Sequence, residues 1–282
     1  MMIAQTTLND WYPVAQADPA ITPAHVETTV LGRPFQVTRT TTGWQATDAD
    51  GQPRDCVVKF DHVWLCPGTP AAPLFDIPEA DQPGRRHVPC GVVRVKCSPL
   101  RAVENFLDVA HFPFVHTDIL GAEPHTEVER YKVEIRENND EIWATKVRFF
   151  QPQAAKSAGD GIYTDYMYRV PSPMNAILYK TSPPRPGEWD VITIFVQPVS
   201  EDLCDVWPWM ALYDDDSTLS DLIQFQQTIF LQDRSILENQ IPQRLPLDPR
   251  MEVPTRADMT SVAYRRWLKK RGATYGALLE VA

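Results

Sequence analysis

Apolar and polar residues alternate along much of the second half of the chain, and such alternation is typical of half-buried strands. The alternating runs are rich in Val, Ile, Tyr, Phe and Trp, and turn residues such as Asn138 and Asn139 separate them. The pattern predicts an antiparallel sheet of six strands, at about residues 126–136, 140–149, 161–170, 175–181, 190–199 and 204–213.

Three other segments carry helix signals. The first is predicted at 99–111, with Ser98 as N-cap and Pro99 at the first helical position. A long helix is predicted at about 216–239, and a last helix at about 256–271 has a basic end that suits the helix dipole.

The first 98 residues have a different pattern. Residues 26–51 and 56–66 are typical of short strands, whereas the proline-rich segment 67–89 is expected to be irregular because proline removes backbone donors. We therefore expect an α+β protein with a β-rich region at 1–98 and a second domain at 99–282, in which a long helix lies across an antiparallel sheet.

Composition and net charge exclude some kinds of binding partner and cellular location. The 282 residues carry a net charge of −10, which argues against nucleic acid as a partner because phosphate binding needs a basic patch. Five irregularly spaced cysteines favour reduced thiols over a disulfide framework. We found no signal peptide and no apolar run long enough to span a membrane, so the sequence predicts a cytoplasmic protein.

The densest candidate chemistry lies in the run ENFLDVAHFPFVH. Glu104, Asp108 and His111 stand at i, i+4 and i+7, which is one face of a helix. His116 lies five residues beyond His111, and Pro113 between them is expected to end the helix and let His116 turn back. Two imidazoles with one carboxylate are the ligands of a facial-triad Fe(II) site.

The third ligand must come from elsewhere, and Asp233 in the predicted long helix is the best candidate. It stands among apolar residues, where a carboxylate is costly to bury unless it is paired or binds a metal. Glu238 and Asp221 are weaker alternatives. The residues alone also leave a structural interpretation open, in which the histidines belong to the core or surface and Asp233 pairs with Arg234 or a lysine.

The spacing Glu104-x3-Asp108-x2-His111-x4-His116 resembles the (D/E)-x3-D-x2-H-x4-H signature of Rieske-type non-heme iron oxygenases. The resemblance implies a helix-grip (START-like) catalytic domain in which His111, His116 and Asp233 hold Fe(II). Asp108 would link this iron to an incoming Rieske cluster across a subunit boundary. Glu104 would be a neighbouring polar group at the surface where electrons arrive.

The family's [2Fe–2S] cluster is held by C-x-H and C-x2-H motifs upstream, and this sequence has neither. None of His25, His62 and His87 follows a cysteine at the required spacing. The β-rich region is therefore interpreted as a truncated remnant of a Rieske domain without its [2Fe–2S] cluster. Electrons from NADH would come through a separate Rieske-containing reductase or ferredoxin; an additional structural subunit and a trimeric core are also implied by the family.

Within the family the chain resembles catalytic subunits that demethylate methylxanthines. This implies O2-dependent conversion of 7-methylxanthine to xanthine and formaldehyde. The flat substrate would bind between the sheet and the long helix, against four apolar residues: Ile229, Phe230, Ile236 and Leu237. Gln226, Gln227 and Asn239 are candidate polar contacts by proximity only.

Three alternatives remain open on the sequence. One is an O-demethylase or hydroxylase acting on another aromatic substrate, and another is a zinc hydrolase with the same ligands. The third is a non-catalytic subunit on the same fold, against which the intact set of His111, His116 and Asp233 argues.

Overall fold

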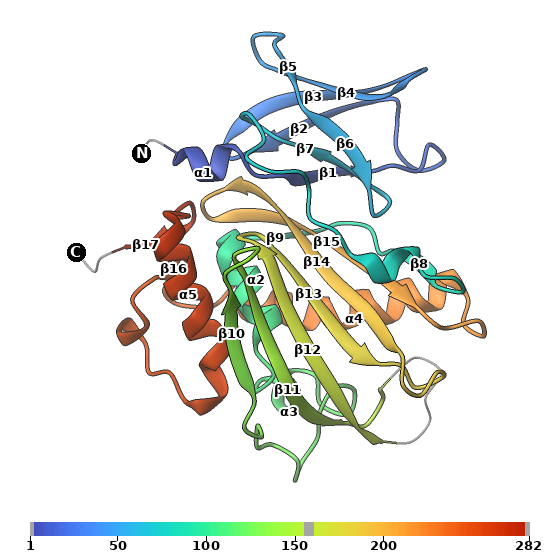
Figure 1. Cartoon of the computed structure of the whole chain (residues 1–282), viewed down its shortest axis with the longest axis vertical. Helices are drawn as coiled ribbons and strands as arrows, with labels where there is room; N and C mark the ends of the chain where they lie inside the picture. The colour runs from blue at the N-terminus through green and yellow to red at the C-terminus, as the bar shows by residue number, and fades with distance from the viewer. Residues whose placement is uncertain (1–2, 155–160, 280–282) are drawn as a thin grey trace.

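A large antiparallel sheet dominates the fold (Figure 1). The computed structural model describes residues 3–154 and 161–279. The strand order is β10-β11-β12-β13-β14-β15-β8, and β9 also pairs with β15. The strands of this sheet are β8 (Arg86–Pro89), β9 (Val93–Val95), β10 (Lys132–Arg136), β11 (Glu141–Gln151), β12 (Ile162–Ser172), β13 (Asn175–Thr181), β14 (Trp189–Ser200) and β15 (Leu203–Leu212).

The six strands predicted from alternation are confirmed as β10 to β15, with one boundary corrected. The first strand begins at Lys132 rather than near residue 126. Within the described chain, the residues just before Lys132 do not pair with a strand. Instead, the hydroxyl of Tyr131 donates to the carbonyl of Ala257 at 2.6 Å, near the start of α5 (Met259–Arg271). The segment predicted to be irregular at 67–89 also ends differently, since its last four residues form β8 against β15.

The helix α2 (Pro99–Leu107) begins as expected, because the side chain of Ser98 accepts a hydrogen bond from the amide of Leu100 at 3.2 Å. Its predicted extension to residue 111 is wrong. Asp108 has extended backbone angles, and its Oδ1 accepts from the amide of Ala110 at 2.8 Å. An aspartate that bonds the backbone two residues ahead offers an alternative to the helix and ends it.

Two further helices complete the second part of the chain. The long helix α4 (Leu219–Leu237) starts with a capping box between Thr218 and Asp221, which explains why it begins later than predicted. The helix α5 (Met259–Arg271) ends at Gly272 in the left-handed conformation. Figure 1 shows α4 lying across one face of the large sheet, with α2 beside it.

The first part of the chain forms small sheets above one end of the large sheet in Figure 1. One has the order β1-β7-β6 and another the order β2-β3-β4-β5. These elements are α1 (Gln5–Leu8), β1 (Tyr12–Gln16), β2 (His25–Val30), β3 (Arg33–Thr40), β4 (Gly43–Asp48), β5 (Pro53–Arg54), β6 (Cys56–Lys59) and β7 (His62–Leu65).

The two parts of the chain share a hydrophobic core. Tyr12, Phe35 and Leu65 belong to the same buried cluster as Val103 and Tyr168. Backbone hydrogen bonds also join the parts, since the amide of Leu31 donates to Pro198 at 2.6 Å and that of Gly32 to Val199 at 2.9 Å. The cluster positions the end of α2, and therefore the loop that follows it.

The remaining elements are short: α3 (Phe112–Val115), β16 (Leu245–Pro246), β17 (Ala277–Leu278), and the 3-10 turns η1 (Pro78–Asp81), η2 (Pro249–Met251) and η3 (Arg256–Asp258). Among the described residues, no helix combines the length and the apolar character needed to cross a membrane.

Candidate metal centre

Both histidines are positioned by one short turn of helix. His111 is the N-cap of α3 and His116 is its C-cap, so a spacing of five residues brings the two rings to opposite ends of a single turn. Pro113 lies in the first turn of α3 rather than ending the preceding helix. Phe112 anchors the turn, since its buried ring packs edge-on against Phe149 with centroids 5.7 Å apart.

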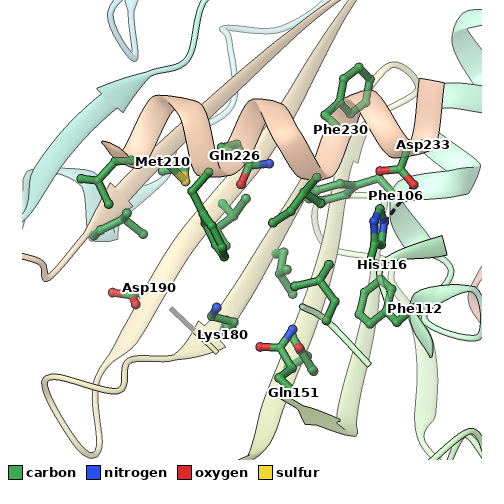
Figure 2. A pocket seen from close by; sticks show the side chains of 18 of the residues that line it. Phe106, Phe112, His116, Gln151, Lys180, Asp190, Met210, Gln226, Phe230 and Asp233 are labelled. Carbon is green, nitrogen blue, oxygen red and sulfur yellow. Dashed lines mark ion pairs between the residues drawn. The ribbon is translucent and has the colours of Figure 1, made fainter. Parts of the chain in front are cut away.

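Asp233 reaches the same point from α4. Its Oδ1 lies 3.0 Å from Nε2 of His116 and 3.3 Å from Nε2 of His111. The two Nε2 atoms are 3.1 Å apart. Figure 2 shows Asp233 and His116 facing each other at one end of a cavity. Among the described residues this is the one group of three such side chains arranged to hold a metal ion.

The separations fit a bound divalent ion. Metal–ligand bonds of about 2.1 Å at right angles put neighbouring donor atoms about 3.0 Å apart. Both rings also present the correct nitrogen. The Nδ1–H of His111 donates to Oδ2 of Asp108 at 3.0 Å, and that of His116 donates to Oε1 of Gln232 at 2.8 Å. Each Nε2 therefore carries the lone pair that a metal needs.

The electrostatics of the cluster favour a cation. Burial lowers the pKa of His111, but hydrogen bonds to Asp108 and Asp233 outweigh burial and raise that pKa to about 9. Burial raises the pKa of Asp233, yet its hydrogen bonds to the two histidines hold it below the usual value. A metal ion bound here would take the place of the proton that the carboxylates otherwise favour.

The other acidic candidates lie elsewhere. Glu238 pairs with Arg234, with Oε1 3.0 Å from the guanidinium Nε, so Arg234 is engaged away from Asp233. Asp221 caps the start of α4. Of Asp221, Asp233 and Glu238, only Asp233 lies beside the two histidines.

Glu104 is largely buried and takes part in an internal ion-pair network, although it lines the same cavity as Asp108. Its side chain is buried and accepts hydrogen bonds from Arg101 at 2.8 Å, from Arg265 at 2.6 Å and from Ser261. Glu252 also contacts both arginines. Glu104 therefore belongs to an internal ion-pair network, whereas Asp108 keeps 29% of its side chain exposed. Asp108 and Glu104 both line a second cavity, which His111 and Asp233 also border.

The cavity beside the metal centre lies between α4 and the large sheet (Figure 2). Ile229 and Phe230 line it as expected, but Ile236 and Leu237 do not and instead line the second cavity. Both residues share a face of α4 with Asp233 but lie one turn further along the helix, where they meet residues of α2 and α5 instead of the substrate side of the sheet. Ile236 is half exposed and Leu237 is buried in the core.

Of the three polar residues proposed as substrate contacts, one lines the cavity and two do not. Gln226 lines the cavity, as its labelled side chain in Figure 2 shows. Gln227 instead donates to the carbonyl of Cys90 at 2.7 Å, and the exposed Asn239 donates to the carbonyl of Ser235 at 2.8 Å.

Sequence reasoning missed Gln232, the acceptor for His116, because a helical glutamine next to Asp233 carries no signal by itself. It also missed several residues that line the cavity. Phe106 comes from α2, and the large sheet contributes Gln151, Tyr166, Tyr168, Lys180 and Asp190. Tyr166 and Tyr168 stand at i and i+2 of a predicted strand, so they share a face, but the sequence does not tell which face is buried.

Comparison with known proteins agrees with this arrangement. Residues 95–274 match the family model of the vanillate O-demethylase oxygenase C-terminal domain. A protein of Pseudomonas sp. (strain TJI-51), named "Probable methylxanthine N7-demethylase NdmC", is 42% identical over 271 residues, which cover 95% of this chain and 96% of that protein.

Solved structures share the fold. NdmA of Pseudomonas putida CBB5, solved with caffeine, superposes with a TM-score of 0.74 at 18% identity, over 94% of this chain and 91% of that one. Dicamba monooxygenase bound to dicamba superposes with a TM-score of 0.72 at 17% identity, over 96% and 98% of the two chains. The structure is thus an α+β protein built like the catalytic domains of Rieske oxygenases. On the family match and the close relative together, this chain belongs to the Rieske oxygenase catalytic-domain family and is a homologue of its demethylases.

Proposed function

We propose that this chain is the catalytic subunit of a methylxanthine N7-demethylase that converts 7-methylxanthine to xanthine and formaldehyde. The observation that carries the proposal is the convergence of His111, His116 and Asp233 at one end of a largely apolar cavity. The identity of 42% to a protein named for this activity supports the choice of substrate class.

His111, His116 and Asp233 would hold Fe(II), which supplies the activation of O2 for hydroxylation of the N-methyl group. One oxygen atom enters the methyl group and the other leaves as water, at the expense of two electrons and two protons. The hydroxymethyl group then breaks away as formaldehyde and leaves the ring N–H.

The chain's own residues position the substrate. Phe106 and Phe230 are among the residues that line the cavity, and they provide apolar surface for a flat ring. Holding the methyl group beside the metal converts the reaction into an oriented, intramolecular-like step. Burial of His116 and the apolar walls keep bulk water away from the reacting group.

The electrons must come from another protein in this account. We propose that a Rieske-containing reductase or ferredoxin, reduced by NADH, docks near Asp108, whose carboxylate contacts His111 at 3.0 Å and is partly exposed. The β-rich first part of the chain is proposed to be a truncated Rieske domain without a cluster, and the second part a helix-grip domain. A trimeric core within a larger hetero-oligomer is proposed from the family alone.

The test is reconstitution of the purified chain with Fe(II), NADH and a Rieske-containing reductase. We expect formaldehyde and xanthine in equal amounts from 7-methylxanthine. The variant Asp233→Asn should lose bound iron and activity, whereas the matched variant Glu238→Gln on the same helix should keep both. Iron that remains bound after Asp233→Asn would contradict the ligand assignment.

A second candidate is O-demethylation of a methoxylated aromatic, which the name of the matching family model favours. A panel of N-methyl and O-methyl substrates, read out by formaldehyde, separates the two functions. Faster formaldehyde release from a methoxybenzoate than from every methylxanthine would favour the second candidate.

A further inference from the structure

The end of the cavity opposite the metal centre is polar and buried. Lys180 and Asp190 are paired across β13 and β14, and both line the cavity. Only 6% of Lys180 and 4% of Asp190 are exposed. Figure 2 shows the two labelled side chains below α4, away from His116 and Asp233.

Among the described residues, few hydrogen bonds reach these two charges. The ammonium of Lys180 donates to the carbonyl of Ala154, and Oδ1 of Asp190 accepts from the amide of Tyr213 at 3.0 Å. In the part of the chain that the structure describes, no ion pair joins Lys180 to Asp190. Arg85 is close, but its guanidinium donates to the carbonyls of Trp189 and Ala211. An ammonium has three donors and a carboxylate about four acceptor sites, so hydrogen-bonding capacity is left over.

Burying these two charged side chains lowers the stability of the fold. Burial lowers the pKa of Lys180 to about 8 and raises the pKa of Asp190 above its usual value. Buried charges that are not in contact with a partner destabilise a fold by several kcal/mol. An apolar pair at these sheet positions would fold better, so the pair is better explained by what enters the cavity.

Three neutral polar groups that line the same cavity also support a bound ligand. Gln151 Oε1 and the hydroxyls of Tyr166 and Tyr168 are buried, and none has a hydrogen-bond partner within residues 3–154 and 161–279. Buried polar atoms without partners are rare and call for a ligand or an ordered water. All three residues line this cavity.

The sheet register arranges the charges beside each other. Tyr166 pairs with Lys180, and Lys180 pairs with Asp190, so the three residues form one row across β12, β13 and β14. Neighbouring strands lie about 4.8 Å apart, which puts a cationic donor next to an anionic acceptor. A ring that presents a carbonyl next to an N–H can meet both at once.

We propose that Lys180 and Asp190 are specificity-determining residues that bind the lactam edge of the substrate ring. Lys180 donates to the ring carbonyl, and Asp190 accepts from the adjacent ring N–H. The methyl group to be removed then lies at the opposite end, beside His111 and His116. The identity of the ring as a xanthine rests on the proposed function.

The proposal has a direct consequence for selectivity. A ring whose lactam nitrogen carries a methyl group has no N–H to give, and it leaves the buried carboxylate of Asp190 without a partner. Sites built to bond a polar group reject analogues that lack it much more strongly than apolar sites reject an extra methyl group. The wild-type protein should therefore prefer 7-methylxanthine to 1,3,7-trimethylxanthine.

The test compares Asp190→Asn with the wild type on these two substrates in the reconstituted system. We expect kcat/KM for 7-methylxanthine to fall about tenfold or more, while that for 1,3,7-trimethylxanthine changes by less than about threefold. Lys180→Met should weaken both substrates, because both keep the carbonyl. Asp165→Asn, on the exposed face of β12, is the matched control and should change neither value. An equal loss on both substrates for Asp190→Asn would overturn the proposal.

Direct binding separates this proposal from the proposed function. Xanthine carries the lactam edge and no methyl group, so its affinity can be measured by calorimetry on the full chain without turnover. We expect Asp190→Asn to bind xanthine about tenfold more weakly, with a melting temperature no lower than that of the wild type. Asp190-dependent xanthine binding without any demethylation would refute the function and leave the inference standing. If the chain demethylates 7-methylxanthine but Asp190→Asn and Lys180→Met bind xanthine as tightly as the wild type, then the proposed function stands and this inference is wrong.

Discussion

Replacing Gln232 with leucine removes the group that fixes the orientation of His116. The Nδ1–H of His116 donates to Oε1 of Gln232 at 2.8 Å, and only 1% of His116 is exposed, so burial leaves little room for a replacement acceptor. Leaving a buried N–H unpaired costs about 1–3 kcal/mol. The ring can avoid that cost by rotating or by moving its proton to Nε2, and either change removes the lone pair from the metal centre.

We therefore expect Gln232→Leu to weaken Fe(II) binding by about 10- to 100-fold, the usual effect of removing a partner of a metal-bound histidine. This range equals about 1.4–2.7 kcal/mol of binding free energy. The assay is an anaerobic Fe(II) titration of the metal-free protein against a competing chelator.

Two variants serve as controls for this prediction. Gln232→Glu keeps an acceptor and should bind Fe(II) at least as well as the wild type. Gln224→Leu makes the same change at an exposed position of α4 and should have no effect. If Gln232→Leu binds Fe(II) within twofold of the wild type, then the assigned role of this hydrogen bond is wrong.

Four more predictions follow from the structure. Asp108→Asn should retain iron at saturating Fe(II) but lose at least about 99% of NADH-driven formaldehyde release, because the carboxylate is the proposed electron path to His111; normal turnover would refute that path. Glu104→Ala should lower the free energy of unfolding by about 3 kcal/mol in urea titrations, since two buried arginines lose one of their shared carboxylates, while bound iron stays unchanged; a loss of iron at equal stability would point to a role at the site instead. For Lys180, burial lowers the pKa from 10.5 to about 8, so the folded state binds fewer protons than the unfolded state between these values. The wild type should gain up to about 3 kcal/mol of stability as the pH rises from 8 to 10.5, and Lys180→Met should lack this gain; equal slopes for both proteins would contradict the burial argument. Ile236→Ala should leave KM unchanged, because this residue lies outside the substrate cavity; a raised KM would restore the original sequence-based assignment.

The elements that sequence reasoning predicted well are those with a local cause. Alternation over β10 to β15 reports one buried face per strand, and it predicted these strands to within a few residues apart from the start of β10. The N-cap Ser98 is equally local, since its side chain bonds an amide two residues away. The signature spacing identified the two histidines because their positions are set by a single turn, α3.

The errors arise where a distant partner decides the outcome. The sequence placed Glu104 beside Asp108, but it did not reveal the ion pair with Arg265, 161 residues later, that holds Glu104 in an internal network. Ile236 shares a face of α4 with the cavity residues, but the cavity ends at Asp233, and residues of α2 and α5 meet the helix beyond that point. Lys180 and Asp190 become neighbours only through the register of β13 and β14, which no local pattern encodes.

The most direct test of the whole account is single-turnover formation of formaldehyde from 7-methylxanthine by the Fe(II)-loaded chain, with and without a separately purified, pre-reduced Rieske-containing protein. The account predicts one formaldehyde per iron when the reduced cluster protein is present, and none when it is omitted or when Asp233→Asn replaces the wild type. Equal formaldehyde yields with and without the cluster protein would contradict the claim that this iron site depends on electrons from another polypeptide.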